Sequence, residues 1–231
     1  MLAFHRTGRH IRWVPITTRP DATMTDAPPN PSLARWNERF AGDDYLFGTA
    51  PNAFLVSQQS LLKPGQRALA VADGEGRNGT WLAAQGLQVL AIDASPVGLT
   101  KARRLAAERG VELETRVVDI ETFDWTADSW DVIAAIFIQF AGPPLRARIF
   151  AGMRQALAPG GHLILQGYRP EQLDYGTGGP PYAENMYTEE MLREAFADLE
   201  IAHLEAHDSE IHEGRGHDGM SALIDLVARK P

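Results

Sequence analysis

Short apolar runs alternate with amphipathic segments along most of this chain, and this pattern predicts alternating strands and helices. The run at residues 131–138 is almost wholly apolar, which is typical of a central strand buried on both faces. The predicted strands cover residues 68–72, 88–93, 112–118, 129–138, 162–167, 199–207 and 222–228. The predicted helices cover residues 33–40, 51–62, 77–85, 96–109, 144–157 and 189–197. Regular alternation of this kind predicts an α/β fold with a doubly wound, mostly parallel sheet.

The last two predicted strands break the alternation, because no helix fits between them. Residues 208–221 are polar and contain Gly214, Gly216 and Gly219. We therefore expect a C-terminal antiparallel hairpin at the sheet edge, which completes a seven-stranded sheet. If the sixth strand is parallel to the rest, the tip at residues 210–217 overhangs the face where the strands end.

The strongest local signal is a glycine turn between the first strand and its helix. Asp73-Gly74-Glu75-Gly76 follows the apolar run directly, and helix-compatible residues begin at Arg77. Such a turn leaves backbone N–H groups free to bind an anion or a hydrogen-bond acceptor. Asp93 ends the second strand 20 residues after Asp73, which is where doubly wound folds bind a ribose diol. Alternatively, the turn is an ordinary one and Asp93 only caps the next helix.

Two further strand ends carry candidate ligand-binding residues. Asp119 follows the third strand and could accept a hydrogen bond from a purine amino group, with Ile120 packed on the ring. Gln139 and Phe140 follow the apolar central strand, where a reversal of strand order places a ligand. Asp119 could instead only stabilise a turn.

Composition excludes several classes of function. The 231 residues carry a net charge of −8 with no basic stripe, so nucleic acid is not an expected partner. No apolar stretch reaches the length of a membrane span, so no membrane association is expected. The absence of cysteine excludes disulfides and thiolate metal sites, and we predict no metal site and a cytoplasmic location.

The first 31 residues differ in character from the rest. Residues 1–31 are rich in Arg, Thr and Pro and lack the apolar core of a secretory signal. We expect a disordered extension, or an annotated start that is too early, with Met24 as the initiator. Residues 32–231 then form a single domain.

Three segments resemble known families. Residues 74–78, with residues 81–83, look like the first motif of the tellurite-resistance methyltransferases. Residues 210–212 and 228–230 resemble the C-terminal hairpin of the same family. Residues 36–45 are similar to the cofactor-covering segment of the thiopurine methyltransferases. The chain thus resembles class I S-adenosylmethionine-dependent methyltransferases over about residues 36–230. The resemblance implies the Rossmann-like methyltransferase fold and S-adenosyl-L-methionine as cofactor.

The resemblance also implies roles for individual residues. Where the family has an acid and a glycine on the first strand, this chain has Ala70 and Ala72, so we expect Asp73 to contact the methionyl ammonium instead. The resemblance implies that the cofactor approaches the backbone at Gly74 and Gly76 and lies beside the helix start at Arg77 and Asn78. It implies that Asp93 binds the ribose and that Ala94, Asp119 and Ile120 contact the adenine. Phe137 and Gln139 would then line the methyl-donor end, and Trp36 and Tyr45 would close the pocket.

The implied reaction is in-line displacement of a methyl group onto a small-molecule acceptor. The resemblance favours a thiol or a selenium or tellurium oxyanion, which needs little base catalysis. A harder hydroxyl or amine would need a general base, for which His212 and His217 are the candidates, with Arg215 as an anion anchor. Alternatively, this loop is a solvated turn. The expected protein is a monomer or a homodimer.

Two other functions fit part of the pattern. Gly74, Gly76 and Gly79 match the dinucleotide fingerprint, so an NAD(P)-dependent oxidoreductase is the main alternative. Asp73 argues against it, because its charge would lie beside the pyrophosphate, and so does the lack of a second catalytic domain. A non-catalytic S-adenosylmethionine-binding protein is the other alternative.

Overall fold

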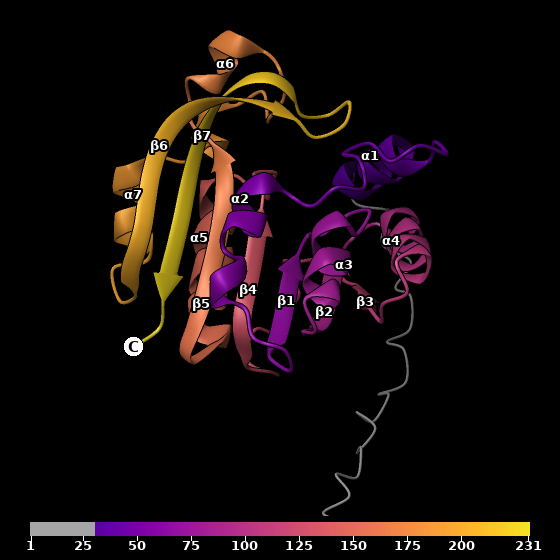
Figure 1. The fold of residues 1–231 in the computed structure, drawn as a ribbon. Helices are drawn as coiled ribbons and strands as arrows, with labels where there is room; N and C mark the ends of the chain where they lie inside the picture. Colours follow the sequence, from indigo (N-terminus) through magenta and orange to yellow (C-terminus); the bar gives the residue numbers. More distant parts are fainter. Residues whose placement is uncertain (1–30) are drawn as a thin grey trace, which may run out of the picture.

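The computed structural model describes residues 31–231, so all of the predicted N-terminal extension except Pro31 lies outside the described residues. Its centre is a seven-stranded sheet in the order β3-β2-β1-β4-β5-β7-β6 (Figure 1). The strands are β1 (Arg67–Val71), β2 (Gln88–Asp93), β3 (Glu114–Val117), β4 (Trp130–Ile136), β5 (Leu157–Tyr168), β6 (Glu200–His212) and β7 (Asp218–Arg229). Strands β1 to β5 pair in parallel, and β7 is antiparallel to both of its neighbours. The predicted fold class is confirmed.

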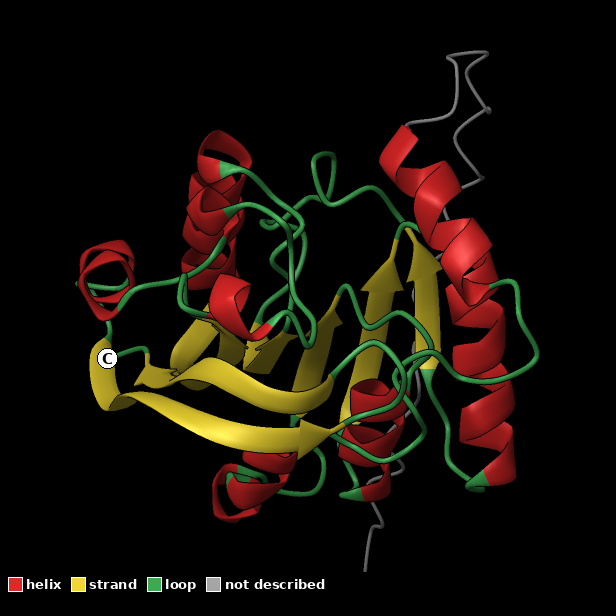
Figure 2. Ribbon diagram, turned by 90° about the horizontal axis from the view of Figure 1, so that it is seen from above, coloured by secondary structure: helices red, strands yellow, loops and turns green. Residues whose placement is uncertain are grey.

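Helices cover both faces of the sheet (Figure 2). They are α1 (Pro31–Phe40), α2 (Ala53–Ser57), α3 (Arg77–Ala84), α4 (Pro96–Glu108), α5 (Pro143–Ala156), α6 (Gln172–Tyr175) and α7 (Glu189–Ala195), with 3-10 turns at Gln59–Leu61 and Ala183–Asn185. One apolar core joins the sheet to α5 and α7, and a second joins the opposite face to α2 and α3. Alternate residues of β1 enter different cores, Leu69 the first and Ala70 the second, as expected for a strand buried on both sides.

The terminal hairpin is longer than the sequence pattern predicts. Its ladder continues to the pair His212↔Asp218, so the loop consists only of residues 213–217. The prediction was wrong here because the extra rungs are polar and mostly exposed, and an edge ribbon tolerates polar residues on both faces. In Figure 1 this ribbon bends over the upper edge of the sheet toward α1.

The helix predicted at residues 51–62 is also shorter in the structure. It begins at Ala53, after the N-cap Asn52, whose side-chain oxygen accepts a hydrogen bond from the Leu55 N–H at 3.0 Å. A 3-10 turn follows at Gln59–Leu61. Asn52 itself is buried, and it lies close to the residues that build the site below.

Candidate functional site

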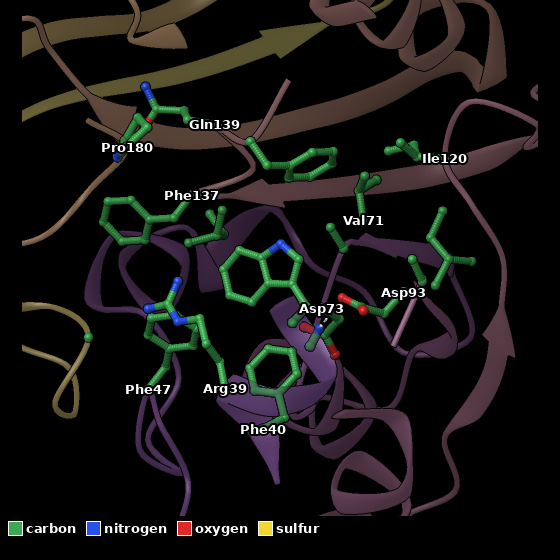
Figure 3. Close-up of a pocket in the computed structure, with 18 of the residues that line it drawn as sticks. Arg39, Phe40, Phe47, Val71, Asp73, Asp93, Ile120, Phe137, Gln139 and Pro180 are labelled. Carbon is green, nitrogen blue, oxygen red and sulfur yellow. Dashed lines mark hydrogen bonds between the residues drawn. The ribbon is translucent and has the colours of Figure 1, made fainter. Parts of the chain in front are cut away.

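A cavity of about 850 Å³ lies at the carboxyl ends of β1, β2 and β4 (Figure 3). It lies where the strand order reverses between β1 and β4, the usual ligand position in doubly wound sheets. Helix α1 and the segment 178–182 supply other parts of its wall. The volume falls in the range of roughly 300–1,000 Å³ that is typical of small-molecule sites.

Most residues predicted to bind the cofactor meet at this cavity. The predicted residues that line it are Trp36, Asp73, Gly74, Arg77, Asn78, Asp93, Ala94, Asp119, Ile120, Phe137 and Gln139. Apart from Trp36 on α1, they come from the ends of four strands and from the first turn of α3, segments that only the sheet topology brings together.

Asp93 supports the glycine turn as well as the cavity wall. Its carboxylate accepts hydrogen bonds from the N–H of Gly74 at 2.9 Å and from the N–H of Ser95 at 2.7 Å. Burial raises the pKa of Asp93, and these two hydrogen bonds oppose that rise. The acid therefore holds the turn in place from the ribose side of the cavity.

Asp73 lies at the start of α3 and faces the same cavity. Its two oxygens accept from the Gly79 N–H at 3.2 and 3.1 Å. Burial, together with the charge of Asp93, raises the pKa of Asp73 to about 7 despite these hydrogen bonds and the charge of Arg77. A ligand cation placed beside Asp73 would therefore be stabilised by a carboxylate that has little other compensation.

Gly76 and Tyr45 do not line the cavity, contrary to expectation. A Cβ on Gly76 would lie 2.5 Å from the Cβ of Ala102, so this glycine allows α3 to pack against α4. The hydroxyl of Tyr45 donates to the Lys101 carbonyl at 3.2 Å and is directed to α4. Phe47 lies on the cavity instead, with its ring 6.4 Å from that of Trp36.

Gly76→Ala is expected to destabilise the protein by about 2–4 kcal/mol, because it combines a backbone clash with a φ of +88°. Gly110→Ala is the matched control. Gly110 has a φ of +67° but no atom within 4 Å of the added Cβ, so it should cost only about 1 kcal/mol. Urea unfolding measures both. Equal losses would show that contact with α4 is not what requires glycine at residue 76.

Phe137 and Gln139 shape the end of the cavity that follows β4. Phe137 has a φ of +55°, and its N–H donates to the Gln166 carbonyl at 2.8 Å. The Gln139 amide forms two hydrogen bonds with the backbone of Tyr168. Its nitrogen donates to the Tyr168 carbonyl at 2.8 Å, and its oxygen accepts from the Tyr168 N–H at 2.6 Å. Gln139 therefore fixes the end of β5 and has little capacity left for a ligand.

His217 is the catalytic candidate that the hairpin carries into the cavity. It is only 7% exposed, and its ring lies 4.5 Å from Phe47 and 4.3 Å from Phe137. Its Nδ1 is 3.9 Å from Oε2 of Glu213, too far for a hydrogen bond, and has no hydrogen-bond partner among the described residues. Burial and the charges of Arg77 and Arg39 lower the pKa of His217, despite the opposing effect of Glu213, so it is a neutral base at pH 7.

Glu213 is a site residue that the sequence reasoning missed. It accepts from Arg77 Nη2 at 2.7 Å and from Asn52 Nδ2 at 2.9 Å, and so joins the hairpin tip to α3 and to the start of α2. Although burial opposes it, contact with His217 and Arg77 lowers the pKa of Glu213 to about 2. The available signal was an acid on a glycine-rich tip that overhangs the ligand face.

His212 and Arg215, the other two catalytic candidates, do not reach the cavity. Both are absent from its lining, and the His212 side chain is 68% exposed. A 2.6 Å hydrogen bond with Asp218 raises the pKa of His212. For these two residues the structure agrees with the alternative of a solvated turn, since Arg215, the predicted anion anchor, is exposed and lies outside the cavity lining.

Comparison with known proteins agrees with this geometry. Residues 68–161 match a family model described as a methyltransferase domain. Over these residues the chain is similar to a methyltransferase domain. Curated relatives that match are uncharacterised proteins of Mycobacterium tuberculosis and Mycobacterium bovis, 30% identical over 123 residues, or 53% of this chain and 44% of theirs. The chain thus spans less than half the length of these relatives.

Solved structures support the methyltransferase fold. TehB from Haemophilus influenzae has 18% identity and a TM-score of 0.66, over 86% of this chain and 67% of that one. The N-methyltransferase NodS from Bradyrhizobium japonicum, in complex with S-adenosyl-L-homocysteine, has 17% identity and a TM-score of 0.65, over 87% and 100%. The [4+2]-cyclase SpnF is also similar, with 21% identity and a TM-score of 0.62, over 86% and 92%. Fold alone therefore does not decide the reaction of this chain.

No helix among residues 31–231 is long and apolar enough to cross a membrane.

Proposed function

We propose that this chain transfers a methyl group from S-adenosyl-L-methionine to a small-molecule acceptor by in-line displacement. The observation that carries the proposal is the meeting of Asp73, Asp93 and Asp119 at one cavity within a methyltransferase domain. Asp93 binds the ribose hydroxyls, while Ala94, Asp119 and Ile120 surround the adenine. The oligomeric state, monomer or homodimer, stays a prediction.

The charges beside the glycine turn fit an amino-acid tail. The Asp73 carboxylate suits an ammonium group, and the buried Arg77 Nη1 has no hydrogen-bond partner among the described residues and suits a carboxylate. A dinucleotide would instead place its pyrophosphate against Asp73. This chemistry favours S-adenosylmethionine over NAD(P).

The protein's contribution to the reaction is positioning and control of one proton. The bound cofactor supplies an activated methyl group on a positively charged sulfur. Phe137 and the rings around it exclude water from the acceptor, and His217 accepts the proton, with the charge of Glu213 3.9 Å from its Nδ1. The family resemblance favours a thiol or a selenium or tellurium oxyanion. A neutral base in the cavity favours an acceptor that arrives protonated, such as a thiol or a hydroxyl.

Two measurements test this proposal. Calorimetry should detect binding of S-adenosylmethionine and of S-adenosylhomocysteine but not of NAD, and methyl transfer should be seen with at least one of a panel of thiols, phenols, selenite and tellurite. Binding without turnover would favour the non-catalytic alternative. Binding of NAD alone would overturn the proposal.

Asp93→Ala is expected to weaken the binding of S-adenosylhomocysteine about 10- to 100-fold, because two charge-assisted hydrogen bonds to the ribose are lost. Asp128→Ala is the control, since Asp128 precedes β4 at the opposite edge of the sheet and pairs with Arg67 on the surface. Circular dichroism checks the fold of both variants, because Asp93 also holds Gly74. An unchanged affinity in folded Asp93→Ala would remove Asp93 from the ribose site.

A further inference from the structure

Arg39 is a second guanidinium on the cavity, and its surroundings differ from those of Arg77. Its Cζ lies 4.6 Å from the centre of the Trp36 ring and 5.7 Å from that of Phe47. Figure 3 shows Arg39 reaching past Phe40 toward Phe47. Arg77 is paired with Glu213, whereas Arg39 forms no ion pair with any carboxylate in the part of the chain that the structure describes.

Both guanidiniums affect His217, but only Arg77 affects Asp73, which is expected to bind the cofactor ammonium. Arg77 is buried, and its Nη1 has no hydrogen-bond partner among the described residues. Arg39 lies over the rings of Trp36 and Phe47, and the Phe47 ring packs on that of His217. Partial burial and the neighbouring Arg35 lower the pKa of Arg39, but its side chain remains exposed, so an anion entering from the cavity can reach it. Arg77 is therefore the partner for the cofactor carboxylate, and Arg39 is left for the acceptor.

The walls between Arg39 and His217 are mostly aromatic. Phe47, Phe137 and Tyr168 surround the His217 ring, and Pro180 and Tyr182 line the cavity nearby. Flat apolar walls with few polar groups favour a planar ring over a flexible polar ligand. A guanidinium stacked on aromatic rings keeps its edge free to bind a carboxylate with two hydrogen bonds.

We propose that the acceptor is a small aromatic carboxylate, with its carboxylate on Arg39 and its hydroxyl or thiol at His217. This inference rests on the proposed function. In the reaction, a bond forms between the acceptor oxygen or sulfur and the methyl carbon as the bond from that carbon to the sulfonium sulfur breaks. The sulfonium sulfur keeps the electron pair and becomes a neutral thioether, and the acceptor proton passes to His217 and then to solvent.

The test compares acceptors with and without a carboxylate. The three hydroxybenzoates are compared with phenol, and the three mercaptobenzoates with thiophenol. The best benzoate isomer should have a kcat/KM about 10- to 100-fold above its neutral counterpart, the usual effect of one charge-assisted pair. Arg39→Gln should remove this preference, and Arg39→Lys should restore part of it. Arg193→Gln, which removes an exposed charge on α7, should leave it unchanged.

Calorimetry with S-adenosylhomocysteine separates failure of this inference from failure of the function. If the wild-type chain binds none, the proposed function itself is wrong. If it binds and methylates neutral acceptors as well as benzoates, or no benzoate at all, only the acceptor assignment is overturned. The assignment is also overturned if Arg39→Gln weakens the binding of S-adenosylhomocysteine but leaves the preference for benzoates over neutral acceptors intact. Arg39 would then bind the cofactor carboxylate.

Discussion

His217→Gln is expected to lower kcat about 10²- to 10⁴-fold for a hydroxyl acceptor, the usual contribution of a positioned general base. Gln fills a similar volume but cannot take the proton. Since His217 is buried and its pKa is lowered, the wild-type kcat should rise with pH through a value below 6.5 and then level off. Stopped-time assays of methylated product from pH 5 to 9 measure both effects.

Two comparisons make the His217 result decisive. His212→Gln, on the same hairpin but exposed, should leave kcat within about twofold. Glu213→Gln keeps an oxygen to accept from Asn52 but removes the charge that raises the pKa of His217, so it should move the pH midpoint of kcat downward. A loss of less than threefold in His217→Gln, with cofactor affinity intact, would show that the acceptor arrives already deprotonated.

The affinity for S-adenosylhomocysteine should be about tenfold weaker at pH 6 than at pH 8, because of Asp73. In the free protein the pKa of Asp73 is about 7, and a bound ammonium group favours the ionised form. Binding therefore releases a proton below pH 7, and affinity rises with pH until the carboxylate is ionised before the ligand arrives. The charged groups that act on Asp73 are Asp93, which opposes ionisation, and Arg77, which favours it.

Calorimetry in buffers of different ionisation enthalpy measures the proton released on binding. Adenosine, which lacks the amino-acid tail, is the control ligand and should bind with a flat pH profile. Asp73→Asn should bind S-adenosylhomocysteine weakly at every pH. The pKa of Asp73 is about 7 in the folded protein, against an ordinary value of 3.8, so the free protein loses stability as pH rises between these two values and no further above them. Asp73→Asn without ligand should therefore melt at a higher temperature than wild type at pH 8. A pH-dependent affinity that persists in Asp73→Asn would assign the proton to another group.

The sequence predicted the sheet well, because local patterns determine it, and the same patterns identified most of the strand-end residues that line the cavity. A strand followed by a glycine turn and an acid 20 residues later places Asp73, Gly74 and Asp93 without knowledge of other contacts. Asp119 and Ile120 follow from the same rule at the next strand.

The acceptor side was predicted less well, because it depends on contacts between distant segments. Three candidates on the hairpin tip looked equivalent in sequence, yet only His217 turns inward, while His212 stays on an exposed rung paired with Asp218. Glu213 acquires its role from Asn52 and Arg77, which no local pattern connects to it. Gly76 matched a ligand-binding motif, but its requirement comes from α4.

The contact between Asn52 and Glu213 joins residues 161 positions apart, so the chain entropy lost in closing this part of the molecule is large. Contacts of such long range form late in folding. On the ribosome, the strands that end near Asp73, Asp93 and Asp119 emerge well before the hairpin that carries His217. The residue proposed as the base is therefore the last part of the cavity wall to be synthesised.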